Sequence, residues 1–166
     1  MSTRTPRRKK EAAGRVEHLM TKEVWVCRPS DSLNHAAQIL WENDIGVLAV
    51  VPDDGSNRLV GILTDRDICM AAYTQGGKLS ELLVDSAMSR RAKACTPMTT
   101  LEEAAGEMAE LQVHRLPVVD GSRQLLGMLS LADLARGAAG KSARGSASVF
   151  ALVGKTLAAV VAPRSA

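Results

Sequence analysis

Aromatic side chains are scarce in this sequence, whose 166 residues include two Trp, one Tyr and one Phe. Proteins that bind single-stranded nucleic acid need aromatic rings on which the bases stack, so this mode of binding is not expected. Cysteines are few as well, and the spacing of Cys27, Cys69 and Cys95 fits neither a C-x-x-C motif nor a disulfide framework. Because unpaired thiols are typical of a reducing compartment, we expect a cytoplasmic protein.

The sequence also has no long hydrophobic run. Its longest apolar stretch, VFALVGKTLAAVVA, is shorter than the roughly 20 residues that a spanning helix needs, and it contains Lys155. No apolar core follows the basic N-terminal residues, so they do not have the pattern of a secretory signal. We therefore expect no membrane partner.

Positive charge is concentrated in residues 1–10, MSTRTPRRKK, which hold five basic and no acidic side chains. The net charge of the whole sequence is +3, so the remaining residues carry a net charge of −2. We interpret residues 1–14 as a flexible basic arm, because terminal segments of this kind are commonly solvated. Accessory, salt-dependent binding of nucleic acid by this arm is the alternative.

Motifs of catalysis are missing from the sequence, which has no Gly-x-Ser-x-Gly, no His-Glu-x-x-His and no P-loop. A nucleophile needs a nearby base and an orienting group, and the three scattered histidines do not supply such a set. No His or Cys spacing is typical of zinc. We therefore expect no enzyme, no catalytic residues, no metal site and no catalytic cofactor.

What the sequence does contain is an internal duplication. A shift of 68 residues superimposes the two halves up to a loop that is two residues shorter in the second copy, and a shift of 66 superimposes them beyond it. The matching pairs include Cys27 with Cys95, Leu33 with Leu101, Val50 with Val118, Gly61 with Gly127, Thr64 with Ser130, and Asp67 with Asp133. Repetition at a fixed period predicts two copies of one structural unit.

Each copy has the pattern of a strand, a helix, two strands and a second helix. Leu33, Ala36, Ala37 and Leu40 recur at the spacing of a buried helical stripe, and the second copy repeats this stripe. We expect an α/β (α+β) fold in which the two β-α-β-β-α repeats pack through their sheets with pseudo-two-fold symmetry. The expected divisions are repeat 1 at 15–76, repeat 2 at 77–140, and a linker with a helix from Ser148 to Val161 within 141–166.

The segments GILTDRD and GMLSLAD place a hydroxyl residue and an aspartate at the start of a helix. Thr64 and Ser130 stand where unpaired backbone N–H groups and the helix dipole favour a phosphate. The carboxylates of Asp67 and Asp133, one turn later, suit the two hydroxyls of a ribose. The same spacing is also that of a capping box, which stabilises a helix without any ligand.

The duplicated unit resembles the cystathionine β-synthase (CBS) domain, and residues 16–139 resemble a tandem CBS pair, or Bateman module, of the small stand-alone bacterial type. The segments GILTDRD, GMLSLAD, VCRPSDSL, ACTPMTTL and VHRLPVVD carry this likeness. The resemblance implies a non-enzymatic regulatory protein that binds AMP, ADP, ATP or S-adenosylmethionine in clefts between the repeats. It also implies pairing of two modules as a flat disk, hence a homodimer, and a separate target protein.

Candidate ligand-binding residues follow from the helix starts, from the neighbouring strands and from the resemblance. His114 and Arg115 point into the central cleft according to the resemblance, and Arg66 lies between Thr64 and Asp67 where the second copy has Ala132. A dimeric interaction scaffold without a ligand is the alternative function. The complete set of candidates is Val26, Cys27, Val47, Leu48, Thr64, Arg66, Asp67, Ala94, Cys95, His114, Arg115, Leu116, Pro117, Ser130 and Asp133.

Overall fold

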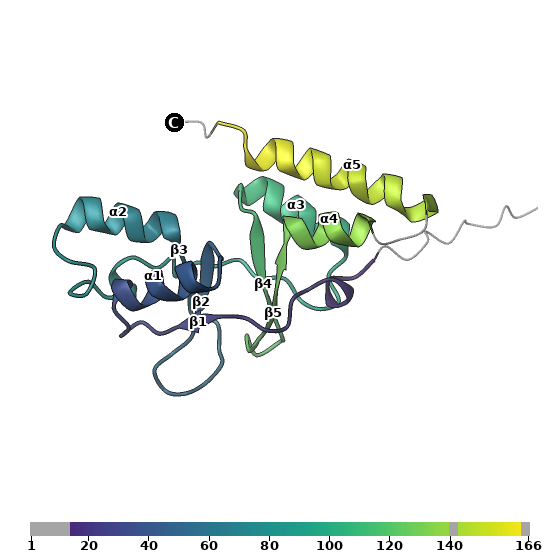
Figure 1. Cartoon of the computed structure of the whole chain (residues 1–166). Helices are drawn as coiled ribbons and strands as arrows, with labels where there is room; N and C mark the ends of the chain where they lie inside the picture. The colour runs from purple at the N-terminus through teal and green to yellow at the C-terminus, as the bar shows by residue number, and fades with distance from the viewer. Residues whose placement is uncertain (1–13, 140–142, 164–166) are drawn as a thin grey trace, which may run out of the picture.

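The computed structural model describes residues 14–139 and 143–163, so nearly all of the expected basic arm lies outside the described residues. Two repeats follow one another along the chain, and a long C-terminal helix lies over the second (Figure 1). The first repeat contains β1 (Val26–Cys27), α1 (Leu33–Glu42), β2 (Val47–Val50), β3 (Gly61–Thr64) and α2 (Asp65–Gln75). The second contains α3 (Leu101–Leu111), β4 (Arg115–Val119), β5 (Leu125–Ser130) and α4 (Leu131–Ala139), and α5 (Ala143–Val160) follows. Short 3-10 helices, Val16–His18 and Val84–Ser86, precede the repeats.

The two repeats build the same small sheet. In the first, β1 runs parallel to β2 and β2 runs antiparallel to β3. In the second, β4 and β5 are antiparallel, and Cys95 forms a parallel bridge with Val118 at the place of β1. The expected order of strand, helix, strand, strand and helix is therefore confirmed, with the first strand of the second repeat reduced to a single bridge.

The first helix of each repeat buries the stripe that the sequence predicts. Leu33, Ala36 and Leu40 of α1 are buried against the first sheet. The counterparts on α3 are buried against the second sheet. Each helix begins at a polar cap, which satisfies a free N–H group of the first turn: the hydroxyl of Ser32 accepts from His35 N–H, and the hydroxyl of Thr100 accepts from Glu103 N–H.

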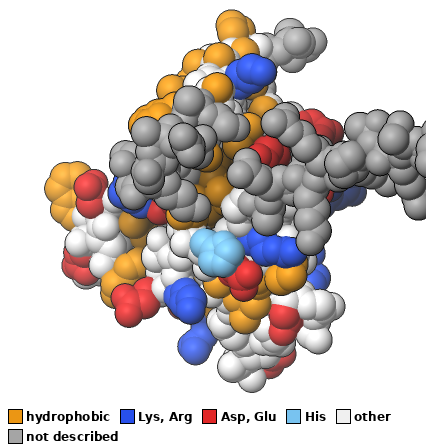
Figure 2. Space-filling model, turned by 90° about the vertical axis from the view of Figure 1, so that its right-hand side faces the viewer, with side chains coloured by type: hydrophobic (Ala, Val, Ile, Leu, Met, Phe, Trp, Pro, Cys, Tyr) orange, Lys and Arg blue, Asp and Glu red, His pale blue; other side chains and the backbone are white. Residues whose placement is uncertain are grey.

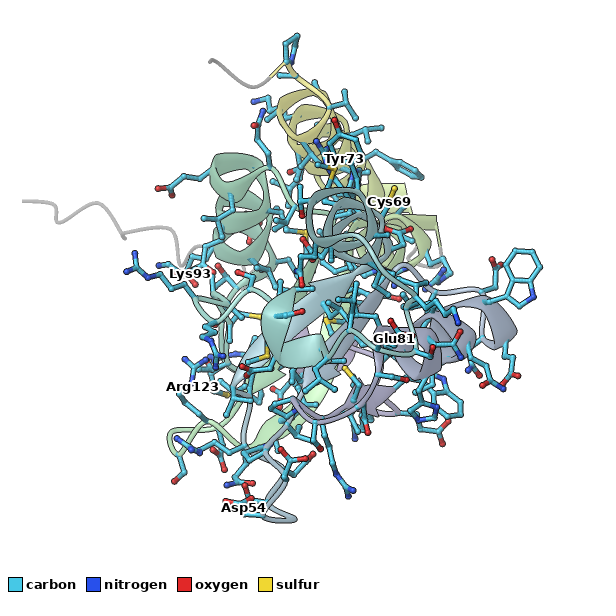
Figure 3. The ribbon with its side chains drawn as sticks, turned by 90° about the vertical axis from the view of Figure 1, so that its left-hand side faces the viewer. Asp54, Cys69, Tyr73, Glu81, Lys93 and Arg123 are labelled. Carbon is cyan, nitrogen blue, oxygen red and sulfur yellow. The ribbon has the colours of Figure 1, made fainter. Side chains whose placement is uncertain are left out.

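A third apolar core lies between the two sheets and joins the repeats. It contains Ala49, Val51, Leu59, Ala92, Val119, Leu125 and Met128. At its edge the two hairpins pair with each other, because Leu59 N–H donates to the Arg123 carbonyl at 2.9 Å and Leu125 N–H donates to the Asn57 carbonyl at 2.8 Å. Figure 3 shows Asp54 and Arg123 on these hairpins. The repeats thus pack through their sheets, as predicted.

The segment that precedes each repeat crosses over and packs on the other repeat. Val16 belongs to the core of the second repeat, and Thr21 pairs with Met128 of β5. Reciprocally, Val84 belongs to the core of the first repeat, and Ser89 pairs with Ile62 of β3. This exchange ties the repeats together at two places related by the pseudo-two-fold axis.

The exchanged segments explain the glycine that opens each repeated motif. A Cβ atom at Gly127 would lie 2.7 Å from the carbonyl oxygen of Thr21, and one at Gly61 would lie 2.9 Å from that of Ser89. Both distances are shorter than a carbon–oxygen contact allows. Glycine is therefore needed at both positions because another backbone passes directly over the strand.

Helix α5 packs against α3 and α4 (Figure 1). It begins at Ala143, before the expected Ser148. Leu152 and Val153 pack on the core of the second repeat, and the side-chain amide of Gln112 donates to the carbonyls of Ala159 and Ala162 at 3.2 and 3.0 Å. None of the helices that the structure describes has the length and apolar character required to cross a membrane.

We expect Gly127→Ala to lower the free energy of unfolding by about 1–3 kcal/mol, because the new methyl group forces the crossing segment off β5. Gly106→Ala is the control, since a Cβ atom there meets nothing within 4 Å, and it should raise stability by about 0.5–1 kcal/mol. Urea unfolding curves measure both. Equal effects of the two substitutions would contradict the close approach.

Candidate functional site

A cavity of about 210 Å³ lies between the repeats. One wall comes from the segment that enters the first repeat and from β2, and the other comes from β4, β5 and the first turns of α4. Its lining residues are Thr21, Glu23, Val24, Trp25, Ile45, Val47, Arg115, Met128, Ser130, Asp133 and Arg136. The exchange of segments forms this cavity, because it brings Thr21 beside β5 of the other repeat.

The start of α4 provides the polar end of the cavity. Both the backbone N–H and the hydroxyl of Ser130 donate to Asp133 Oδ2, at 2.8 and 2.6 Å. In return, Asp133 N–H donates to Ser130 Oγ at 3.1 Å. Asp133 is only 7% exposed, and its other oxygen, Oδ1, forms an ion pair with Arg136. The capping interaction that the sequence predicts is therefore present, and both carboxylate oxygens already have protein partners.

Cations and apolar side chains surround this helix start. Arg115 is half-buried at the beginning of β4, whereas the Arg136 side chain is 72% exposed on α4. Val24, Ile45 and Val47 supply apolar surface from the first repeat. The cavity therefore combines the start of helix α4, the carboxylates of Asp133 and Glu23, two guanidinium groups and an apolar wall, which is the chemistry that recognises a phosphorylated nucleoside.

The equivalent helix start in the first repeat has the same cap without the ion pair. Thr64 N–H and its hydroxyl donate to Asp67 Oδ2 at 2.8 and 2.7 Å, and Asp67 N–H donates back to Thr64 Oγ1 at 3.1 Å. Met70 stands where the second repeat has Arg136, and Arg66 is exposed. Thr64 and Asp67 do not line the 210 Å³ cavity.

The structure brings four of the candidate residues together and separates the others. Val47, Arg115, Ser130 and Asp133 line the same cavity. The rest lie elsewhere: Thr64, Arg66 and Asp67 at the start of α2, Cys27 and Leu48 in the core of the first repeat, Cys95 and Leu116 in the core of the second, Val26 and Ala94 against the core between the sheets, Pro117 buried in β4, and His114 exposed. The His114 carbonyl accepts from Leu131 N–H at 2.9 Å.

Sequence reasoning missed part of the lining. Arg136 lies three residues after Asp133, a spacing that places both side chains on one helical face, so the sequence carried a signal for this pair. Thr21, Glu23, Val24 and Trp25 had no such signal. They reach the cavity only because their segment crosses to the other repeat.

The two cysteines among the candidates are buried thiols with little reactivity. Burial raises the pKa of Cys27 from 9.0 to about 12, and the nearby negative charge of Asp31 adds to this effect. Burial likewise raises the pKa of Cys95 to about 11, with a smaller contribution from Glu107. Cys69 on α2 is exposed. Within residues 14–139 and 143–163, no cluster of three or more His, Cys, Asp or Glu side chains is arranged to hold a metal ion.

Comparison with known proteins identifies the family to which the two repeats belong. The family model described as CBS domain matches residues 16–73 and again residues 81–140. The chain belongs to the CBS domain family. It is 33% identical over 132 residues to the CBS domain-containing protein YhcV of Bacillus subtilis, an alignment that covers 80% of this chain and 91% of that protein.

Two solved CBS structures contain adenosine compounds. The chain is 30% identical to CBSX2 in complex with AMP, with a TM-score of 0.66 over 75% of this chain and 96% of that one. It is 25% identical to the CBS domain pair of protein MJ0100 in complex with 5-methylthioadenosine and S-adenosyl-L-methionine, with a TM-score of 0.67 over 79% and 100% of the two chains. The resemblance inferred from the sequence motifs is thus confirmed.

In the folded protein, we expect a thiol reagent at pH 8 to modify Cys69 rapidly and Cys27 and Cys95 hardly at all, since a buried thiol with a raised pKa forms little thiolate. Mass spectrometry of peptides after timed alkylation measures each site. Cys69→Ser is the control, because it should leave the protein almost unmodified. Rapid modification of Cys27 would show that the first core opens readily.

The raised thiol pKa values also predict a loss of stability at alkaline pH. Unfolded thiols ionise near pH 9.0, whereas the folded Cys27 thiol ionises at about 12, so protons are lost on unfolding in this range. This part of the stability is complete below pH 9 and disappears as pH rises towards 12. In urea titrations between these values, Cys27→Ala should show a shallower fall than the wild type, and equal slopes would contradict the pKa shift.

Proposed function

We propose that this CBS protein is a non-enzymatic sensor that binds an adenosine-containing ligand, such as AMP, ADP, ATP or S-adenosylmethionine, in the 210 Å³ cavity. The observation that carries this proposal is the convergence of Ser130, Asp133, Arg115 and Arg136 at the start of α4, facing an apolar wall of the other repeat. The adenosine compounds bound by two related structures support it.

Each part of such a ligand has a matching part of the cavity. Asp133 accepts hydrogen bonds from the ribose hydroxyls, and the N–H groups of α4 with Arg115 and Arg136 bind phosphate oxygens. Val24, Ile45 and Val47 contact the flat face of the base. Ordinary ligand pockets have volumes of roughly 300–1,000 Å³, so this cavity must widen to admit a whole nucleotide.

The ion pair between Asp133 and Arg136 gives the widening a cause. A ribose that binds Asp133 Oδ1 competes with the Arg136 guanidinium, which then becomes free to contact phosphate. Because the cavity walls belong to different repeats, a ligand that favours the wider cavity shifts how the repeats sit against each other. We propose that this shift, in a cytoplasmic homodimer, regulates a separate target protein.

A ligand-free interaction scaffold is the second candidate function. It is favoured by the capping boxes, because Ser130 with Asp133 and Thr64 with Asp67 satisfy each other's hydrogen bonds without a ligand. Nucleic-acid binding by the basic arm concerns residues 1–13, which are outside the described residues, and it stays an untested alternative.

Isothermal titration calorimetry with AMP, ADP, ATP and S-adenosylmethionine tests the proposal. We expect Asp133→Ala to weaken binding by about 10- to 100-fold, because it removes hydrogen bonds to a charged group. Asp67→Ala is the matched control, since it removes the same capping interaction from the start of α2, where neither Thr64 nor Asp67 lines the cavity. Thermal unfolding of both variants separates the loss of a cap from the loss of ligand binding.

Arg136→Ala distinguishes the two roles of the arginine. We expect it to weaken binding of ATP and ADP, which lose a phosphate contact, and not to weaken binding of S-adenosylmethionine, which has no phosphate. If Asp133→Ala and Asp67→Ala both bind every ligand as the wild type does, the carboxylates are helix caps only. If no adenosine compound binds the wild type, the ligand-free scaffold is the better account.

A further inference from the structure

Helices α1 and α2 expose large apolar side chains. Trp41 is 87% exposed, Tyr73 is 84% exposed and Met70 is 46% exposed. Figure 3 shows Tyr73 and Cys69 on α2, one turn apart. Trp41 on α1 and Tyr73 on α2 are the two most exposed of the four aromatic residues in this chain.

A groove of about 400 Å³ runs into this face, between the end of α1 and the start of α2. Ala37, Leu40, Ile45 and Ile68 form its apolar lining together with Trp41. The carboxylates of Asp44 and Asp65 also line it. We call this groove, with the exposed Trp41 in its lining, the open face.

The equivalent face of the second repeat is covered. Helix α5 lies across α3 and α4 and does not extend over α1 and α2 (Figure 1). The counterpart of Trp41 is Ala109, one turn before Gln112, whose amide binds the end of α5. The small side chain of Ala109 lets α5 approach α3. Among the described residues, no helix covers the equivalent surface of α1 and α2 in the first repeat.

Helix α5 itself has a second apolar side that faces away from the molecule. On the inner side, Leu152 and Val153 pack on the core of the second repeat, and Val160 is buried. The outward stripe consists of Phe150, Gly154, Leu157 and Val161, all of them exposed and spaced by four, three and four residues. This is the spacing of a helix that packs against another helix.

The charge near the outward stripe is opposite to that of the open face. Lys155 is exposed on α5, and the whole helix contains no acidic residue. Hydrophobic side chains gather at the top of Figure 2, at the level of α5, with a basic side chain among them. A basic apolar helix and an acidic apolar groove complement one another.

We propose that the outward stripe of α5 docks into the open face of a second copy of this chain. The stripe and the open face belong to different repeats of each chain, so one two-fold axis closes both contacts at once and leaves neither surface uncovered. Lys155 of each chain lies near Asp44 and Asp65 of the other. The contact joins α5 of one chain to α1 and α2 of the other. It therefore differs from a contact in which α1 and α2 pack directly on the helices of a partner repeat.

This inference rests on the homodimer of the proposed function and does not depend on a ligand. Sedimentation equilibrium of the full chain, at protein concentrations of about 1–100 µM, measures the association of two chains. We expect a dimer, weakened at least about tenfold by Trp41→Ala and by Leu157→Glu. Met98→Glu is the matched control, because Met98 is also apolar and exposed but lies outside both surfaces, and it should leave the dimer intact.

Disulfide crosslinking identifies the contact. Cys69 on α2 is the one exposed cysteine of the chain, so single cysteines placed at Phe150, Gly154, Leu157 and Val161 report proximity to it. We expect mild oxidation to join two chains through Cys69 from at least one of these four positions. The band should disappear when Cys69→Ser is added, and Ser122→Cys in the exposed hairpin of the second repeat should give none.

Each alternative result overturns the inference. A wild type that stays monomeric removes the dimer, whether or not calorimetry detects a ligand. A crosslink that persists after Cys69→Ser shows that α5 packs against α5 of the partner. A dimer that Trp41→Ala and Leu157→Glu leave unchanged, with no crosslink to Cys69, shows that the chains associate through another surface.

Discussion

The exchange of entry segments between the two repeats is the contact on which this structure depends. Thr21 pairs with Met128 across Gly127, and Ser89 pairs with Ile62 across Gly61, so each repeat is completed by backbone from the other. Val16 and Val84 bring apolar side chains into the opposite cores at the same time. Neither repeat has a complete core alone, and the cavity between them exists because the crossing segment forms one of its walls.

The duplication makes much of the fold predictable from the sequence. The buried stripe of α1, the paired glycines and the hydroxyl–aspartate caps all recur at one shift, so each copy supports the interpretation of the other. The crossing could not be predicted, since a valine at position 16 is equally apolar in either core and no local pattern tells which repeat receives it. For the same reason Trp25 and its neighbours were missed as cavity residues.

Within the strands, the sequence predicted which pair of neighbouring residues lies at the candidate site but not which residue of the pair faces the cavity. Successive residues of a strand point to opposite faces, so one of Val47 and Leu48 must face the helices. The structure places Val47 in the cavity and Leu48 in the core of the first repeat, and it separates Arg115 from Leu116 in the same way. The apolar pattern alone does not reveal which member faces the cavity, because both faces of these small sheets are covered.

The two repeats have the same backbone plan and different surfaces. The differences lie at the start of the second helix of each repeat and on the outer surface of the first helix. Arg136 forms an ion pair with Asp133, whereas its counterpart Met70 leaves Asp67 without one. Trp41 is exposed on α1, whereas Ala109 replaces it on α3, the helix that α5 covers. Asp133 and Arg136 of α4 line the cavity between the repeats and α5 packs on α4, so a change of shape at the cavity acts on α4 and on α5. Under the proposed function, α5 is the element through which a ligand in the cavity alters the outer surface of the molecule.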